Sequence, residues 1–230
     1  MNHVIKPSNF APTNIKAFFT TRDFSANNEK ITDALAQELN ISVQNIYLPL
    51  QRHTDNVHIF NGDMKPTVAD AVITDKKDVL IGVIVADCVP ILLFDPSQEI
   101  IAAVHAGWKG TADGILKKTI DRMGSDFGCR SEDILVAIGP SIRQCSYEVG
   151  ADVKEAVEKA TGEGNYFRNK SNKYQIDLST ANRIQAISSG VPDSNIWQSE
   201  ECTYCNPLRY HSYRYSGGSA GRQGGFIGMW

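Results

Sequence analysis

Three short apolar runs follow one another in the middle of the chain. Residues 80–85, 91–94 and 100–104 are rich in valine and isoleucine, and Asp, Pro, Gly or Ser residues bound the runs. Runs of this length and composition are typical of β-strands that are buried on both faces. We therefore expect three buried strands, with polar side chains confined to the connections between them.

Similar patterns elsewhere predict the rest of the secondary structure. Further short apolar runs predict strands at residues 17–21, 46–50, 57–60, 71–74, 134–138, 174–177, 210–213 and 226–230. Apolar residues at helical spacing predict helices at residues 31–39, 151–160 and 179–188, and from Thr111, or the glycine before it, through Met123. Residues 162–173 and 216–221 are polar or glycine-rich and predict a loop and a flexible connection.

The predicted strands outnumber the helices and do not alternate regularly with them. This order favours an α+β fold, with mixed β-sheets flanked by helices in a single domain over residues 1–230. A doubly wound α/β fold is the alternative. It has less support because the sequence contains neither a GxGxxG fingerprint nor a P-loop, so nucleotide-cofactor binding has no support either.

Polar residues capable of chemistry interrupt the apolar runs near strand ends. Asp87 and Cys88 follow the first central strand, His105 follows the third, and His53 follows the strand at residues 46–50. Because α/β proteins tend to place their chemistry outside strand ends, we expect a cysteine and a histidine at one end of one sheet. The proline after Cys88 breaks its strand, and the glycine after His105 permits close backbone approach.

Two imidazoles and one thiol form a ligand set that suits zinc. Three protein ligands leave a fourth position open, which is the pattern of catalytic rather than structural zinc sites. Taken alone, a buried cysteine is usually an inert small hydrophobe, and a lone histidine is usually a hydrogen-bonded structural residue. Only the combination of His53, Cys88 and His105 indicates a metal site.

Composition and charge narrow the class of ligand. The chain has 230 residues, of which 42% are hydrophobic and 21% charged, as in an ordinary globular enzyme. A net charge of −3 and the lack of a basic block argue against nucleic acid or a membrane surface as a partner. No apolar run approaches the ~20 residues of a membrane span, and no signal-peptide pattern opens the chain. We expect a cytoplasmic protein that acts on small molecules, with no protein partner evident.

Five cysteines give no disulfide framework, which agrees with a reducing compartment. Cys202 and Cys205 form a CTYC pair that could be half a zinc site or a redox dithiol. Without a second pair, the pattern favours two unrelated thiols.

Arg22 ends the strand at residues 17–21 and is a candidate anion contact, because a guanidinium offers forked donors to phosphate. A surface arginine with no such role is the equal alternative.

Several motifs together resemble a known family. These are QRHTDNV with His53, ADCVPILLFD with Cys88, AAVHAGWKGT with His105, IGPSI followed by YEVG, and CTY, SYR and GRQ near the C-terminus. In this order they are similar to the YfiH-like, laccase-domain family, often called polyphenol oxidases. The resemblance covers nearly the whole chain. The departures are a short loop between Arg22 and the helix at residues 31–39, and His211 and Tyr215 in place of other residue types.

The resemblance implies a purine nucleoside phosphorylase that cleaves adenosine, inosine, guanosine and methylthioadenosine with phosphate to base and ribose 1-phosphate. It also implies zinc-dependent adenosine deaminase activity. His53, Cys88 and His105 would then be both the catalytic and the metal-binding residues, with zinc as the cofactor. Arg22, Asp87 and Ser141 are candidate substrate-binding residues.

Three other functions stay open. Cys88 could be the nucleophile of a cysteine hydrolase, with His53 or His105 as its base. A copper-dependent polyphenol oxidase is disfavoured, because several coppers need many histidine ligands and this chain has five histidines. A non-enzymatic metal-binding module is the third alternative, although three ligands with an open position argue for chemistry.

Overall fold

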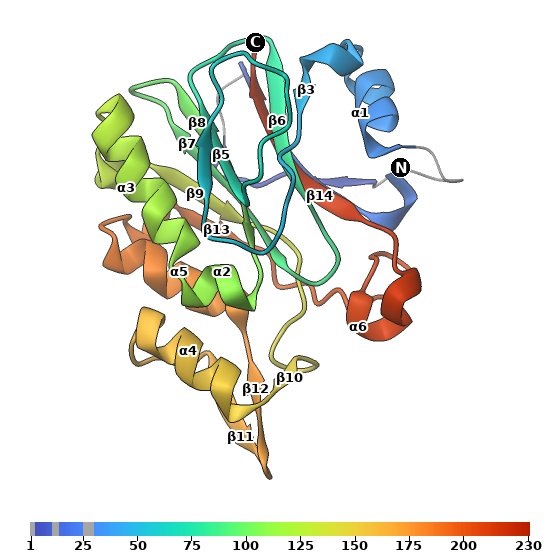
Figure 1. Cartoon of the computed structure of the whole chain (residues 1–230), viewed down its shortest axis with the longest axis vertical. Helices are drawn as coiled ribbons and strands as arrows, with labels where there is room; N and C mark the ends of the chain where they lie inside the picture. Colours follow the sequence, from blue (N-terminus) through green and yellow to red (C-terminus); the bar gives the residue numbers. More distant parts are fainter. Residues whose placement is uncertain (1–2, 11–13, 25–29) are drawn as a thin grey trace.

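The three central apolar runs form long strands, as predicted, but these belong to two different sheets (Figure 1). The computed structural model describes residues 3–10, 14–24 and 30–230. In it, β6 (Val79–Val85) lies in a five-stranded sheet, whereas β7 (Val89–Asp95) and β8 (Ile100–Ala106) pair antiparallel in a six-stranded sheet. The chain therefore crosses between the sheets at residues 86–88, where Cys88 lies.

Each of the two large sheets mixes parallel and antiparallel pairs. The first has the order β1 (Val4–Ile5), β2 (Ile15–Thr20), β14 (Gln223–Met229), β6 and β3 (Ile46–Tyr47). The second has the order β13 (Ile196–Gln198), β9 (Leu135–Ile138), β7, β8, β5 (Ala71–Thr74) and β4 (Val57–Ile59). A small antiparallel sheet has the order β10 (Glu148–Val149), β12 (Lys173–Ile176) and β11 (Phe167–Lys170).

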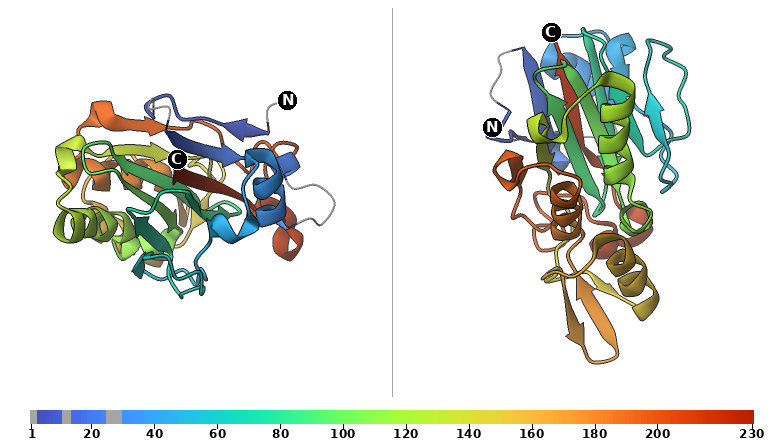
Figure 2. Two further views of the ribbon diagram at one scale, coloured as in Figure 1. Left: turned by 90° about the horizontal axis from the view of Figure 1, so that it is seen from above. Right: turned by 90° about the vertical axis from the view of Figure 1, so that its left-hand side faces the viewer.

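Helices cover the outer faces of the paired sheets (Figure 2). The helices are α1 (Ile31–Leu39), α2 (Trp108–Ala112), α3 (Ile115–Phe127), α4 (Ala151–Thr161), α5 (Leu178–Ser188) and α6 (Tyr213–Ser216). Short 3-10 turns are η1 (Arg22–Phe24), η2 (Val43–Asn45), η3 (Ser131–Asp133), η4 (Asp193–Asn195) and η5 (Gly217–Ser219). α3 and α5 pack on the six-stranded sheet and α1 packs on the five-stranded sheet, while α4 and the small sheet project from one end (Figure 1). The observed fold is α+β, as predicted.

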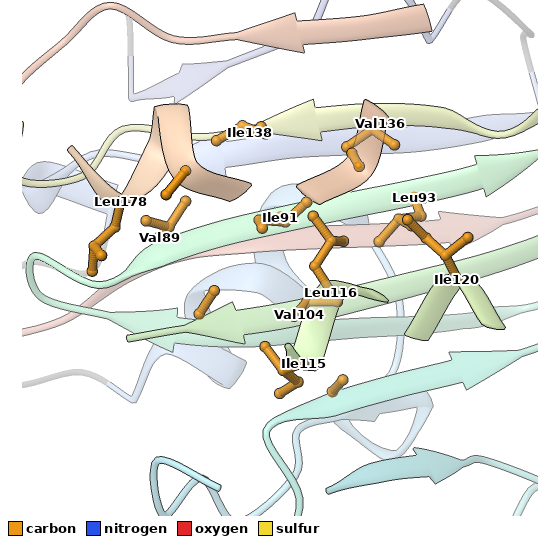
Figure 3. Packing of buried hydrophobic residues seen from close by; sticks show 14 of the residues in the cluster. Val89, Ile91, Leu93, Val104, Ile115, Leu116, Ile120, Val136, Ile138 and Leu178 are labelled. Atoms are coloured by element: carbon orange, nitrogen blue, oxygen red, sulfur yellow. The ribbon is translucent and has the colours of Figure 1, made fainter. Parts of the chain in front are cut away.

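Alternating side chains along the strands explain why the central runs are apolar throughout. On β7, Ile91 and Leu93 face α3 and α5, whereas Leu92 and Phe94 face the other sheet. Figure 3 shows the first of these layers, in which Leu116 of α3 packs over the strands. Burying one such side chain contributes about 1.5–3 kcal/mol. A strand between two apolar layers therefore needs apolar residues at every position.

Several predicted elements differ from the observed ones. The strand expected at residues 46–50 is only β3, which ends at Tyr47, and turn chemistry explains two of the other differences. The helix expected from Thr111 to Met123 is divided into α2 and α3 at Gly114, which has a positive φ of 72°. Residues 210–213 do not form a strand, because Ser212 caps α6 by accepting a hydrogen bond from the Tyr215 amide. The predicted loop at residues 162–173 contains β11, which pairs with β12.

The strands that carry the site residues are also longer than predicted. β8 continues through His105 to Ala106, and Pro90 lies inside β7 opposite His105 rather than ending the strand. The Pro90 carbonyl still accepts a hydrogen bond from the amide of Gly139, which directly follows β9.

Across the described ranges, every helix is too short or too polar to cross a lipid bilayer.

Candidate active site

A cavity of about 640 Å³ opens where the two large sheets meet the C-terminal segment. Its walls come from segments that are far apart in the sequence. The lining residues are Pro49, Leu50, Gln51, Arg52, His53, Ile84, Val85, Ala86, Asp87, Cys88, His105, Trp108, Ile142, Tyr147, Leu178, Tyr213, Arg214 and Arg222. This volume lies in the usual range of small-molecule sites, roughly 300–1,000 Å³.

The structure brings His53, Cys88 and His105 together in one wall of this cavity. The Cys88 Sγ lies 3.9 Å from the His53 Nε2, and the ring centroids of His53 and His105 are 4.8 Å apart. One donor atom from each residue lies within 4.8 Å of the other two. His105 is buried, Cys88 is half-buried and His53 is exposed, so the set is open on the side of the cavity.

Unusual backbone conformations place the three side chains. His53 has a φ of 58°, and Asp87, directly before Cys88, has a φ of 85°. Gly107 allows the close approach: a Cβ there would lie 3.1 Å from the Cys88 Sγ and 3.2 Å from the His53 Cδ2. Positive φ values of this kind are uncommon for residues other than glycine and tend to mark functional sites.

Asp70 holds the two histidines in position. One of its carboxylate oxygens lies 2.7 Å from the His105 Nδ1 and accepts a hydrogen bond from the His53 amide. The other oxygen accepts hydrogen bonds from the amides of Arg52 and Thr54 and from the Thr54 hydroxyl. Asp70 therefore joins β8 to the loop that carries His53. It leaves the His105 Nε2 available at the cavity.

The carboxylate, imidazole and thiol form a charge-stabilised chain. Burial opposes ionisation of Asp70, but hydrogen bonds from His105 and Thr54 hold its pKa well below the usual range. Burial also disfavours the imidazolium, yet Asp70 and Cys88 raise the pKa of His105 to about 9. The two histidines outweigh the burial of the Cys88 thiol and lower its pKa to about 6. The thiol is thus prepared to act as a thiolate.

This donor set fits a zinc ion. Two imidazole nitrogens and one thiolate are typical zinc ligands, and three protein ligands leave a position for water or substrate. The contact of the His105 Nδ1 with the Asp70 carboxylate is of the kind that metal-binding histidines usually have, and it orients the ring for a metal at the other nitrogen. The absence of a side chain at Gly107 keeps the space between Cys88 and His53 clear.

The three predicted substrate-binding residues have different positions. Asp87 lines the cavity, but its carboxylate accepts hydrogen bonds from Thr203, Ser212 and the Arg214 amide. It therefore ties the Cys88 turn to the C-terminal segment.

The other two lie outside the cavity lining. The buried Ser141 hydroxyl lies 2.6 Å from that of Ser179. The Arg22 guanidinium donates to the Pro207 carbonyl.

Sequence reasoning did not single out the cations and aromatic rings that line the cavity. Arg52, Arg214 and Arg222 are exposed at its wall. The Arg214 guanidinium lies 4.9 Å from the centre of the Tyr147 ring and donates to the Glu148 carbonyl. The SYR and GRQ motifs contain two of these arginines, so the signal was present in the sequence. Because these arginines are far from His53 along the chain, the sequence did not indicate that they line the same cavity.

Comparisons with known proteins extend over nearly the whole chain. Residues 6–230 match the family described as multi-copper polyphenol oxidoreductase laccase. The chain is 37% identical over 225 residues to a purine nucleoside phosphorylase of Clostridium acetobutylicum, covering 95% of this chain and 93% of that one. It is 36% identical over 201 residues to adenosine deaminase RL5 from an unknown prokaryotic organism, covering 82% and 76%. The crystal structure of YlmD from Geobacillus stearothermophilus has a TM-score of 0.89 at 28% identity, covering 96% and 93%.

Proposed function

The chain belongs to the multi-copper polyphenol oxidoreductase laccase family, and we propose that it is a purine nucleoside phosphorylase with zinc-dependent adenosine deaminase activity. The first reaction would cleave adenosine, inosine, guanosine and methylthioadenosine with phosphate, releasing the base and ribose 1-phosphate. The names of the relatives support both reactions. The observation that carries the proposal is one cavity that combines a His/Cys/His donor set with arginine and aromatic side chains.

Phosphorolysis needs a phosphate ion held against the C1′ atom of the sugar. Arg52, Arg214 and Arg222 line the cavity and offer guanidinium groups that bind phosphate through paired hydrogen bonds. Contact with the Tyr147 ring limits the orientations that Arg214 can take. A phosphate contact at Arg22 stays a prediction from the sequence. Because the Arg22 guanidinium already donates to the Pro207 carbonyl, we favour the cavity arginines as the phosphate ligands.

The purine base needs an apolar surface and a hydrogen-bond donor for its departing nitrogen. Trp108, Ile142 and Leu178 supply apolar lining. Burial raises the pKa of Tyr147 to about 12, so its hydroxyl stays protonated at neutral pH and can donate. These groups would act by positioning and by stabilising the charge of the leaving base.

Deamination needs a water molecule that replaces the C6 amino group of adenosine as ammonia leaves. His53, Cys88 and His105 would hold zinc, which supplies the Lewis acidity that activates water near neutral pH. Asp70 keeps His105 oriented through its Nδ1 atom, and Asp87 keeps the Cys88 turn in place.

We propose zinc rather than copper. Within the described part of the chain, the groups of potential metal donors contain only two histidines in total.

A cysteine hydrolase is the second candidate, because the pKa of Cys88 is lowered to about 6 beside two imidazoles. In that mechanism Cys88 would be a nucleophile and His105 its partner, and no metal would be required. Removal of metal separates the two candidates. A hydrolase of this kind keeps its activity after treatment with a chelator, whereas a zinc-dependent deaminase loses it.

The deciding experiment measures products from inosine and adenosine at several phosphate concentrations. We expect inosine cleavage to saturate with phosphate and to yield ribose 1-phosphate, and adenosine to release ammonia without phosphate. Free ribose as the only sugar product at every phosphate concentration would refute the phosphorylase. Bound metal with no product from either nucleoside would favour a non-enzymatic binding module, and phenol oxidation with copper would favour the polyphenol oxidase.

A further inference from the structure

A second cluster of metal-type donors lies outside the cavity. The Sγ atoms of Cys145, Cys202 and Cys205 all lie within 4.8 Å of one another, and those of Cys145 and Cys205 are 3.5 Å apart. Cys145 and Cys205 are exposed and Cys202 is buried. None of the three lines the cavity. The sequence suggested unrelated thiols at Cys202 and Cys205, but folding adds a third sulfur from a distant segment.

The fold builds this cluster from two segments. Cys145 lies in the connection between β9 and β10, and Cys202 follows β13 and forms a parallel bridge with Ser141. The Thr203 amide also donates to the Ser141 carbonyl. The backbone thus holds the two segments side by side, and this pairing brings their cysteines together.

Polar groups lie within hydrogen-bond distance of all three sulfurs, while burial and the neighbouring thiols raise the pKa of Cys145 to about 11. The Arg143 amide donates to the Cys202 Sγ at 3.4 Å. The Ser146 hydroxyl lies 3.5 Å from the Cys145 Sγ and 3.2 Å from the Cys205 Sγ. Hydrogen bonds from amides and hydroxyls to sulfur stabilise the charged form, which is the form that binds metal.

The spacing of the sulfurs corresponds to a metal site. With zinc–sulfur bonds of about 2.3 Å, tetrahedral ligands lie about 3.8 Å apart, close to the 3.5 Å between the Cys145 and Cys205 sulfurs and within the 4.8 Å that bounds all three. A disulfide requires two sulfurs at about 2.05 Å and would leave the third thiol unused. We propose that Cys145, Cys202 and Cys205 form a second metal site, which binds a soft d10 cation such as Zn²⁺ through three thiolates and leaves a fourth position at the surface.

Metal at this site would link segments that also shape the cavity. Before Cys145 in the sequence, the Ile142 amide donates to the carbonyl of Asp87, the residue directly before Cys88. After Cys145 in the sequence, Tyr147 lines the cavity. The segment that contains Cys202 and Cys205 leads to Tyr213 and the arginines. The role we infer for this metal is to hold these segments together, and it does not depend on the proposed reaction.

A cadmium titration of the full chain tests the proposal. Cys88→Ala is the background, so that the site in the cavity contributes no thiolate. After reduction and removal of metal, Cd²⁺ should bind with an ultraviolet thiolate-to-cadmium absorbance that saturates at about one equivalent with the intensity of three thiolates. Zn²⁺ should displace it and raise the unfolding temperature, because a ligand of the folded state stabilises that state.

Substitution of the exposed cysteines identifies the ligands without disturbing the core. Adding Cys145→Ser or Cys205→Ser should each remove about one third of the absorbance and abolish the thermal shift by Zn²⁺. Adding Cys129→Ala, which removes a buried thiol outside both sites, is the control and should change neither the absorbance nor the thermal shift by Zn²⁺. Each variant is first checked for a native circular dichroism spectrum.

Three results would overturn the proposal. One is the lack of thiolate absorbance in the Cys88→Ala protein. Another is full absorbance retained in Cys145→Ser. The last is a Cys145–Cys205 disulfide in protein purified without reductant, combined with no uptake of Cd²⁺ after that bond is reduced, which would show a redox dithiol instead.

Discussion

At the scale of single residues, Asp70 holds two of the proposed metal ligands, His53 and His105. Its buried carboxylate accepts hydrogen bonds from three consecutive amides, from one hydroxyl and from His105. A carboxylate is needed because all of these partners donate. An amide at this position would present its own N–H groups to at least some of them, which leaves buried donors without acceptors.

We therefore predict that Asp70→Asn weakens zinc binding about 10–100-fold, the usual effect of losing an outer-shell partner. The free energy of unfolding should also fall, by about 1–3 kcal/mol. Chelator competition and urea unfolding measure the two effects. Asp75→Asn is the control, because among the residues that the structure describes the Asp75 side chain makes only an exposed ion pair with Lys76. Wild-type affinity in Asp70→Asn would show that Asp70 does not position the ligands.

Gly107 provides a second test at this scale. In Gly107→Ala, the new Cβ would press on both the Cys88 Sγ and the His53 Cδ2, so one ligand must move. We expect loss of bound zinc and of deamination, with an unchanged urea midpoint. Gly218→Ala is the matched control, because a Cβ there has no neighbour within 4 Å. Normal zinc content in Gly107→Ala would mean that the site tolerates a wider spacing.

At the scale of elements, the short helix α6 depends on Asp87 and Ser212 for its position. Ser212 caps the helix by accepting from the Tyr215 amide, and its hydroxyl donates to Asp87. Asp87 also accepts from the Arg214 amide. A helix of four residues has little stability of its own. These contacts therefore decide where Tyr213 and Arg214 lie relative to Cys88.

We predict that Ser212→Ala raises the KM for phosphate more than it lowers kcat, because it loosens Arg214 without touching the metal ligands. Loss of the cap itself should cost about 0.5–2 kcal/mol in the free energy of unfolding. Steady-state kinetics with inosine and varied phosphate measure the split. Ser219→Ala, in the next turn and exposed, is the control. An equal fall in kcat with an unchanged KM would place α6 outside the phosphate site.

At the scale of the whole molecule, one nearly buried ion pair joins three parts of the chain. The Arg143 guanidinium donates to Asp177, which caps α5 through the Thr180 amide, and to the Ser199 carbonyl after β13. The side chains of Arg143 and Asp177 are only 12% and 10% exposed. Removing one partner would leave the other charge buried without compensation.

Arg143→Ala should therefore lower the free energy of unfolding by about 3–5 kcal/mol. Arg130→Ala is the matched control, because Arg130 also pairs with two acids, Glu132 and Asp133, but is 67% exposed. The control should lose about 1 kcal/mol or less. Urea unfolding measures the free energy of unfolding of both variants. An equal fall in the two would mean that burial does not make the Arg143–Asp177 pair more important for stability than an exposed pair.

Local pattern was enough to predict the central strands, the helix at residues 31–39 and the α+β class. These features follow from side-chain periodicity, which acts over a few residues. The motifs around His53, Cys88 and His105 identified the three residues that the fold gathers. A positive φ at Asp87 or a division of the helix at Gly114 could not be predicted, because tertiary contacts select those conformations.

The sequence alone therefore determined which residues are apolar, where strands can form and which side chains offer nitrogen or sulfur donors. Tertiary structure decided which of these donors meet. Only the pairing of β7 with β8 brings Cys88 close to His105, only the return of the C-terminal segment brings Arg214 to Tyr147, and only the bridge at Ser141 brings Cys145 to Cys202. The physical reason is that these contacts join residues distant along the chain, and their geometry is set by packing of the whole molecule rather than by local preference.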